Sequence, residues 1–189
     1  IMNNDINKVL ENFVFEDGIS VKFWGVGGSP PGNEELMRQQ ASFLSGMGVN
    51  LVRRHTVSGT IGNPIDPDSL DHFDKWFAIL KEHGIYMQWS VFYPHRITED
   101  DGYPLFDELS NGKVGGLVTV FPELQAYEWE YLEQVMNHVN PYTGLKYADD
   151  PALAIVEVRN EDSVFFGNPL NRLESDYPQH TAILKSDWA

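Results

Sequence analysis

Four apolar, strand-like runs alternate with four helix-like segments along this chain of 189 residues. The runs expected to be strands are 21–28, 49–57, 85–92 and 152–161. The segments expected to be helices are 33–48, 66–84, 122–139 and a fourth that begins near Tyr177. A crossover between parallel strands needs about the length of a helix, so this order predicts a parallel sheet in an α/β fold.

The expected helices carry recognisable start and stop signals. Asn33 stands where it can cap the helix expected over 33–48, and Gly48 follows its last turn. In the segment 66–84 the apolar side chains recur at helical spacing, which predicts one apolar face. They are Leu70, Phe73, Trp76, Phe77 and Leu80.

A parallel sheet of this kind can be an open doubly wound sheet or a closed (β/α)8 barrel of the TIM type. The glycine-rich turn 24–33 tests the first plan, because a dinucleotide-binding turn has G-x-G-x-x-G opening directly into a helix. Here Pro30 and Pro31 interrupt the turn, and no G-x-x-x-x-G-K-[ST] phosphate loop occurs. The sequence therefore gives only weak support to a nucleotide site, and we expect no cofactor.

The number of units favours part of a barrel. An eight-unit barrel typically needs about 250 residues, and four units make half of one. We therefore expect the N-terminal half of a longer (β/α)8 barrel, with a lead-in over 1–18 and a long loop over 93–121 after the third strand. The alternative is a complete small domain of four units. A half-barrel would expose strand edges and apolar surface, so the expected partner is a C-terminal half or a second copy.

The composition excludes several classes of partner. The 28 acidic and 13 basic residues give a formal charge of −15, which disfavours nucleic acid and anionic membranes because both attract clustered Lys and Arg. No run of eighteen apolar residues could span a membrane, and the first residues lack the pattern of a signal peptide. The chain has no Cys and its helical histidines lack an i, i+4 partner, so we expect no metal site.

In folds of this kind, functional residues gather at the carboxyl ends of the parallel strands. The side chains expected there suit a sugar, since aromatic rings can stack on its apolar faces while polar groups bond its hydroxyls. They are Trp24, Arg53, Arg54, His55, Trp89, Ser90, Phe92, Tyr93, His95, Arg159, Asn160 and Glu161. Strand alternation predicts that Glu157 can pair with an interior arginine and leave Glu161 free. On its residues alone, an Asn-Glu-Asp run is also typical of a turn or helix cap.

Several stretches of the sequence resemble cellulase-like glycoside hydrolases of clan A, which are family 5-like TIM barrels. They are VKFWGVGG (21–28), GVNLVRRH (48–55), LDHFDKWFAILKEHGIYM (70–87) and HVNPYTGLKYADDPALAIVEVRNEDS (138–163). The resemblance covers roughly residues 19–189. Its most specific element is the pair Asn160-Glu161 after the fourth apolar run.

The resemblance implies roles for the matching residues. In that clan the Glu of the pair is the general acid/base and the Asn holds the 2-hydroxyl of the sugar, which implies these roles for Glu161 and Asn160. The Arg at the end of the second strand, here Arg53, often supports the nucleophile. The substrate-binding set expected from strand ends and resemblance together is Asn160, Arg53, His55, Trp24 and His95.

The sequence departs from the clan pattern in two places. Relatives often carry a histidine near the end of the third strand, where this chain has Ser90, and His95 would have to replace it. The clan's nucleophile is a second Glu after a seventh strand, whereas the nearby candidates here are Glu157 and Glu174, neither at that position. Retaining cleavage needs two carboxyl groups about 5–5.5 Å apart. We therefore expect half an active site, and an isolated chain that is inactive.

The function expected from all of this is a retaining glycosidase that acts on a β-linked oligo- or polysaccharide, with its nucleophile in a C-terminal half. The alternative is a non-catalytic carbohydrate-binding or scaffold protein that keeps the fold without the chemistry. A barrel lyase or aldolase is disfavoured, because the strand ends offer no lysine for a Schiff base. Secretion, or export to a bacterial periplasm, follows from the resemblance alone.

Overall fold

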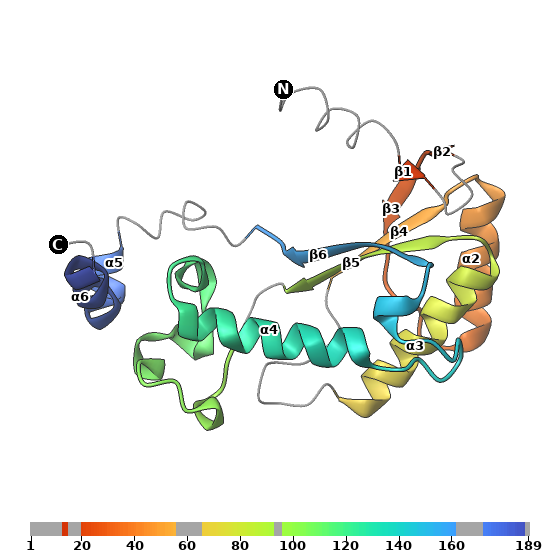
Figure 1. Ribbon diagram of the computed structural model, residues 1–189. Helices are drawn as coiled ribbons and strands as arrows, with labels where there is room; N and C mark the ends of the chain where they lie inside the picture. Colours follow the sequence, from red (N-terminus) through yellow and green to blue (C-terminus); the bar gives the residue numbers. More distant parts are fainter. Residues whose placement is uncertain (1–12, 15–19, 56–65, 93–95, 162–171, 188–189) are drawn as a thin grey trace, which may run out of the picture.

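The computed structural model describes residues 13–14, 20–55, 66–92, 96–161 and 172–187. Within these ranges one parallel sheet has the strand order β3-β4-β5-β6 (Figure 1). Its strands are β3 (Gly25–Gly27), β4 (Leu51–His55), β5 (Tyr86–Phe92) and β6 (Leu153–Arg159). The long helices are α2 (Glu34–Gly46), α3 (Pro67–Glu82), α4 (Pro122–Asn137) and α6 (Pro178–Asp187). Strands that follow one another in sequence are neighbours in the sheet, which confirms the predicted α/β class.

Local signals in the sequence set the beginnings of α2 and α3. The side-chain oxygen of Asn33 accepts a hydrogen bond from the amide of Leu36 at 3.0 Å, and Asp66 accepts one from the amide of Ser69 at 2.9 Å. Each bond satisfies an amide that has no partner inside its helix. The apolar face expected on α3 is buried in the core. Its most buried members are Phe73, Trp76, Phe77 and Leu80.

The apolar run 21–28 is not a single strand, contrary to expectation. Ser20–Val21 form β2, which pairs antiparallel with β1 (Phe13–Val14) in a separate small sheet, and β3 begins at Gly25. The two strands are divided at Trp24, whose amide donates to the side chain of Asn50 at 2.7 Å. The amide of Asn50 donates to the Trp24 carbonyl in return, at 3.2 Å. Because both residues precede their strands, Trp24 lies at the amino end of the sheet.

The long connection predicted over 93–121 has regular structure of its own. It contains the short 3-10 helices η1 (Glu99–Asp101), η2 (Phe106–Glu108), η3 (Ser110–Gly112) and η4 (Gly115–Thr119). Gly112 has a φ of 68°, and a Cβ there would lie 2.0 Å from the carbonyl oxygen of Ile97. Only glycine therefore fits where these two backbone segments meet.

The last helical segment is divided at Tyr177 into α5 (Leu173–Asp176) and α6. His180 of α6 is fully buried against the long connection: its Nδ1 lies 2.6 Å from the Glu108 carboxylate and its Nε2 lies 2.8 Å from the Tyr103 hydroxyl. Glu108 also accepts hydrogen bonds from the amides of Gln179 and His180. We call Tyr103, Glu108 and His180 the His180 clasp, because they join α6 to the connection after β5.

A membrane-spanning helix is not found among the described segments, since none is both long and apolar enough.

Candidate active site

Polar side chains share one face of the sheet where β4, β5 and β6 end. The strand register sets His55 beside Ser90, and Ser90 beside Glu157. Two residues earlier along β4 and β5, Arg53 lies beside Gln88. Alternation along each strand directs these side chains to a common face. A hydrogen bond from Gln88 to the Glu157 carboxylate at 3.1 Å shows that β5 and β6 share it.

Arg53 is at the centre of these contacts. Its Nε and Nη2 each donate to a carboxylate oxygen of Glu157 at 2.9 Å, which is the pairing that strand alternation predicted. Nη2 also donates to the side-chain oxygen of Asn160 at 2.5 Å, and Nη1 donates to Nε2 of His55 at 2.9 Å. The side chains of Arg53 and Glu157 are 32% and 25% exposed, so water still reaches this pair. We call Arg53, His55, Gln88, Glu157 and Asn160 the Arg53 cluster.

Asn160 directly follows β6 and has a fixed orientation. Its amide donates to the carbonyl of Phe92 at 3.1 Å, which continues the strand pairing beyond β6. The residue is only 7% exposed. A guanidinium can only donate hydrogen bonds, so the atom that faces Arg53 is the side-chain oxygen. The NH2 group of Asn160 is left to donate elsewhere, and no other residue of the described ranges accepts from it.

Glu161 has a different environment from its neighbour. Its side chain is exposed, and no hydrogen bond links its carboxylate to another residue that the structure describes. Its φ is 53°, in the left-handed region, where a residue with a Cβ is disfavoured by about 1–2 kcal/mol. Strained backbone of this kind is found preferentially at functional sites. Glu161 thus presents an exposed carboxylate directly beside the rigidly held Asn160.

The structure does not bring all of the expected residues to this face. Trp24, expected at the carboxyl end of the first strand, lies at the amino end because the strand begins after it. Arg159 extends to α4, where its Nη2 donates to Glu128 at 2.6 Å, and it does not join the Arg53 cluster. His95 lies outside the described residues.

Two polar side chains of β5 belong to this face as well. Gln88 was missed by sequence reasoning, although its alternation with Ser90 was a signal that could have found it. Ser90 is fully buried beside His55 and Glu157 in the strand register. Its hydroxyl has no hydrogen-bond partner in the part of the chain that the structure describes.

The two carboxylates considered as nucleophiles are both engaged. The oxygens of Glu157 accept three hydrogen bonds from Arg53 and Gln88. Glu174 lies on α5 and pairs with Lys185 at 2.5 Å, a bond that lowers the pKa of Glu174. Among the described residues, no group of three or more His, Asp or Glu side chains could hold a metal ion.

Solved structures match this chain, whereas no protein-family model and no curated protein does so significantly. The endo-1,4-beta-mannanase from Rhizomucor miehei matches with a TM-score of 0.59 and 19% identity, over 79% of this chain and 46% of that one. A glycoside hydrolase family 5 mannosidase from Rhizomucor miehei matches with a TM-score of 0.58 and 12% identity, over 86% of this chain and 51% of that one. The exo-beta-1,4-mannosidase from Opitutaceae bacterium strain TAV5 matches with a TM-score of 0.55 and 14% identity, over 79% of this chain and 26% of that one.

The fold is that of these glycoside hydrolases. This confirms, at the level of the fold, the resemblance to clan A barrels that the sequence motifs indicated. The chain spans about half the length of the two Rhizomucor enzymes. At such low identity the match shows the fold alone.

Proposed function

We propose that this chain provides the N-terminal four units of a retaining β-glycosidase, with Glu161 as the general acid/base. The observation that carries the proposal is the pair Asn160-Glu161 at the carboxyl end of β6, where Arg53 holds the Asn and the Glu stays exposed. The similar structures named above supply the substrate class. Since they are mannanases and mannosidases, we propose a β-linked mannose-containing glycan as the first substrate to test.

The nucleophile would come from a complementary C-terminal half. This is supported by the engagement of Glu157 with Arg53 and of Glu174 with Lys185, which leaves neither carboxylate free. It is also supported by apolar side chains that stay exposed around the two outer strands of the sheet. They are Trp24 before β3, Phe43 and Met47 at the end of α2, and Val156 and Val158 on β6. A second half of a barrel would cover such surfaces and pair the outer strands.

The test of the acid/base role is Glu161→Gln in the whole protein that carries this chain. With a β-mannoside whose leaving group needs a proton, we expect kcat/KM to fall by about 10²–10⁴-fold. With a dinitrophenyl β-mannoside the loss should be far smaller, because that leaving group departs as a stable anion. Glu133→Gln on the exposed face of α4 is the control and should leave both rates unchanged. An equal loss on both substrates, or no loss, would show that Glu161 is not the acid/base.

The engaged carboxylates also favour a second candidate, a carbohydrate-binding protein without hydrolysis. In that case the whole protein would bind mannooligosaccharides but release no product, and Glu161→Gln would leave the affinity unchanged. Isothermal titration calorimetry together with product analysis separates the two candidates. Export from the cell stays a prediction.

A further inference from the structure

We propose that Glu157 is a positioning residue: by fixing the guanidinium of Arg53, it sets the tautomer of His55 and the orientation of Asn160. The inference deepens the proposed function and rests on it for its catalytic consequence. Its structural part rests only on the hydrogen bonds of the Arg53 cluster.

The first step is the geometry of the Arg53–Glu157 pair. Two parallel hydrogen bonds of 2.9 Å, from Nε and Nη2, fix the plane of the guanidinium as well as its position. Gln88 donates to Glu157 at 3.1 Å and so restrains the carboxylate from the side of β5. A single bond would let the guanidinium rotate, whereas this arrangement gives it one orientation.

The second step follows from the chemistry of arginine, which has five N–H donors and no acceptor. Two of these donors bond Glu157, one bonds Asn160 and one bonds His55. The fifth, on Nη1, is engaged by no residue of the described ranges. Both Asn160 and His55 must therefore present an acceptor to Arg53.

The consequence for His55 is a defined tautomer. Its Nε2 lies 2.9 Å from Nη1 of Arg53 and must carry a lone pair, which leaves the ring proton on Nδ1. The consequence for Asn160 is that its oxygen faces Arg53 at 2.5 Å and its NH2 group is directed away. A ligand oxygen at this site would therefore meet the two donors of Asn160.

A second Arg–Glu pair in the molecule provides a matched control. Arg159 donates through Nε and Nη2 to the two carboxylate oxygens of Glu128, at 3.2 and 2.6 Å. This pair has the same chemistry but is more buried, with side chains 22% and 8% exposed against 32% and 25% for Arg53 and Glu157. The side-chain hydrogen bonds of Arg159 go to Glu128 and to Thr119 of η4, on the side of α4. Glu128→Gln thus removes a comparable ion pair without touching the proposed function of Glu157.

The first experiment measures the tautomer of His55 by ¹⁵N NMR in the whole protein, with His55→Gln used to assign the signal. We expect the Nδ1–H form at neutral pH. In Glu157→Gln the signal should shift toward a mixture of tautomers, and in Glu128→Gln it should stay as in the wild type. An Nε2–H or doubly protonated ring in the wild type would overturn the proposal.

The second experiment measures kinetics on an aryl β-mannoside. Misplacement of a positioned group by about 1 Å can cost about 100-fold, so we expect kcat/KM of Glu157→Gln to fall by about 100-fold. Glu157→Asp, which keeps the charge, should recover part of the loss. Equal losses in Glu157→Gln and Glu128→Gln would show a merely structural role and overturn the proposal. If the wild type hydrolyses nothing, the proposed function fails, and the tautomer of His55 alone decides whether Glu157 positions Arg53.

Discussion

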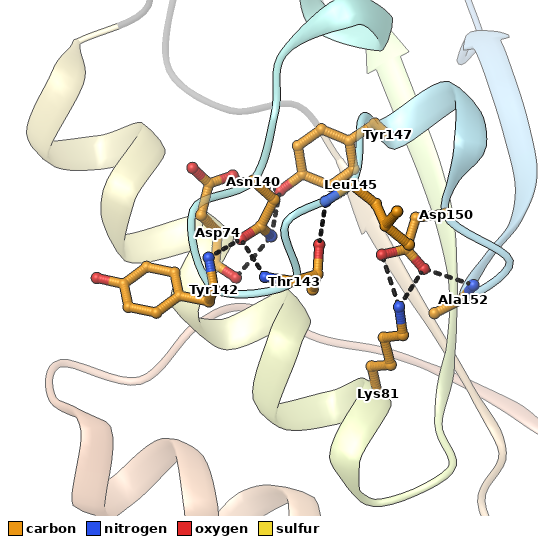
Figure 2. A network of polar contacts seen from close by, with 9 residues as sticks. All are labelled: Asp74, Lys81, Asn140, Tyr142, Thr143, Leu145, Tyr147, Asp150 and Ala152. Carbon is orange, nitrogen blue, oxygen red and sulfur yellow. Dashed lines mark hydrogen bonds and ion pairs between the residues drawn. The ribbon is translucent and has the colours of Figure 1, made fainter.

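Two polar networks lie at opposite ends of β6, and they differ in how far their hydrogen bonds are satisfied. Figure 2 shows the one at the amino end, which we call the Asp74 network. Its members are Asp74, Lys81, Asn140, Tyr142, Thr143, Leu145, Tyr147, Asp150 and Ala152. The other is the Arg53 cluster, where the chain leaves β6. Asp74 is 1% exposed, whereas about a third of the Arg53 side chain reaches solvent.

The Asp74 network is saturated. Asp74 accepts from the Tyr147 hydroxyl at 2.5 Å and faces Nε2 of His138 at 2.7 Å. Asn140 donates to the Asp74 carbonyl at 2.9 Å and accepts from the amide of Tyr142 at 2.8 Å. The polar groups of this network thus bond one another and hold the segment before β6 against α3. A fully hydrogen-bonded buried network of this kind makes the fold rigid.

The Arg53 cluster, in contrast, has hydrogen-bond donors that no residue of the described ranges accepts from. The NH2 group of Asn160 and one N–H of Arg53 are engaged by no residue of the described ranges, and Glu161 beside them is exposed. Arg53 and Glu157 are also partly solvated, so breaking their pair leaves no deeply buried charge. The difference separates polar groups that maintain the architecture from polar groups that can meet a substrate.

The largest expected effect comes from breaking the saturated network. Asp74→Ala would leave the buried Tyr147 hydroxyl without its acceptor and would remove the partner of His138. The Tyr147 hydroxyl is buried, and a buried group left without its partner costs about 1–3 kcal/mol, whereas the His138 side chain is 30% exposed and adds less. We therefore expect the free energy of unfolding to fall by about 2–4 kcal/mol, measured by urea titration followed by circular dichroism.

Asp71 on the same helix provides the control for this prediction. It is exposed and accepts a hydrogen bond from the Tyr142 hydroxyl at 2.7 Å. Asp71→Ala should change the free energy of unfolding by less than about 1 kcal/mol. Equal losses in the two variants would mean that burial and saturation do not distinguish these carboxylates, and the proposed division between the networks would lose its basis.

A smaller effect on stability is expected in the Arg53 cluster. Arg53→Lys keeps the charge but replaces the planar fork by a single ammonium, which cannot serve Glu157, Asn160 and His55 together. We expect the free energy of unfolding to fall by less than about 1.5 kcal/mol in the same urea titration, because the pair is partly solvated. The affinity for a mannooligosaccharide, measured by calorimetry, should fall at least about tenfold. A loss of stability as large as that of Asp74→Ala, with unchanged affinity, would place Arg53 among the structural groups.

Local patterns made part of this molecule predictable. The cap at Asn33 and the buried face of α3 depend on residues within a few turns of one another, and both are found in the structure. The Arg53–Glu157 pair joins residues 104 positions apart. It was still predictable, because side-chain alternation in a parallel sheet leaves few interior partners for a charge.

Features that depend on one specific distant partner were not predictable. Trp24 reads as part of a continuous strand, and only its bonds to the side chain and amide of Asn50 show that the strand begins later. Glu108 reads as one acid among many in an acidic chain, and nothing near it in sequence indicates the contact with His180, 72 positions away. Such pairings depend on how the loops pack, and the periodicity of a single segment does not record that.

The smallest expected effect concerns the His180 clasp. The pKa of its carboxylate, Glu108, is lowered, whereas the pKa of Asp74 is raised. Burial raises the pKa of Asp74, and the bonds from Tyr147 and His138 do not overcome it. Burial also acts to raise the pKa of Glu108, but its hydrogen bonds from the amides of Gln179 and His180 and from the His180 ring outweigh burial and lower it. A lowered pKa in the folded state means that the stabilisation is present above the unfolded pKa and is lost as the pH falls through the folded value.

Glu108→Gln should therefore lower Tm by about 2–4 °C at neutral pH, and the difference from the wild type should shrink as the pH falls below about 4. Thermal unfolding followed by circular dichroism over about pH 3–7 measures this. Tyr103→Phe is the matched control, because it removes the other hydrogen bond of His180 while burial raises the pKa of Tyr103 to about 12, far from this range. Its Tm difference should not follow the titration of Glu108. A Tm difference for Glu108→Gln that stays constant with pH would show that the Glu108 carboxylate does not stabilise the clasp. A complete set of hydrogen bonds would then not be enough to identify the groups that stabilise this fold.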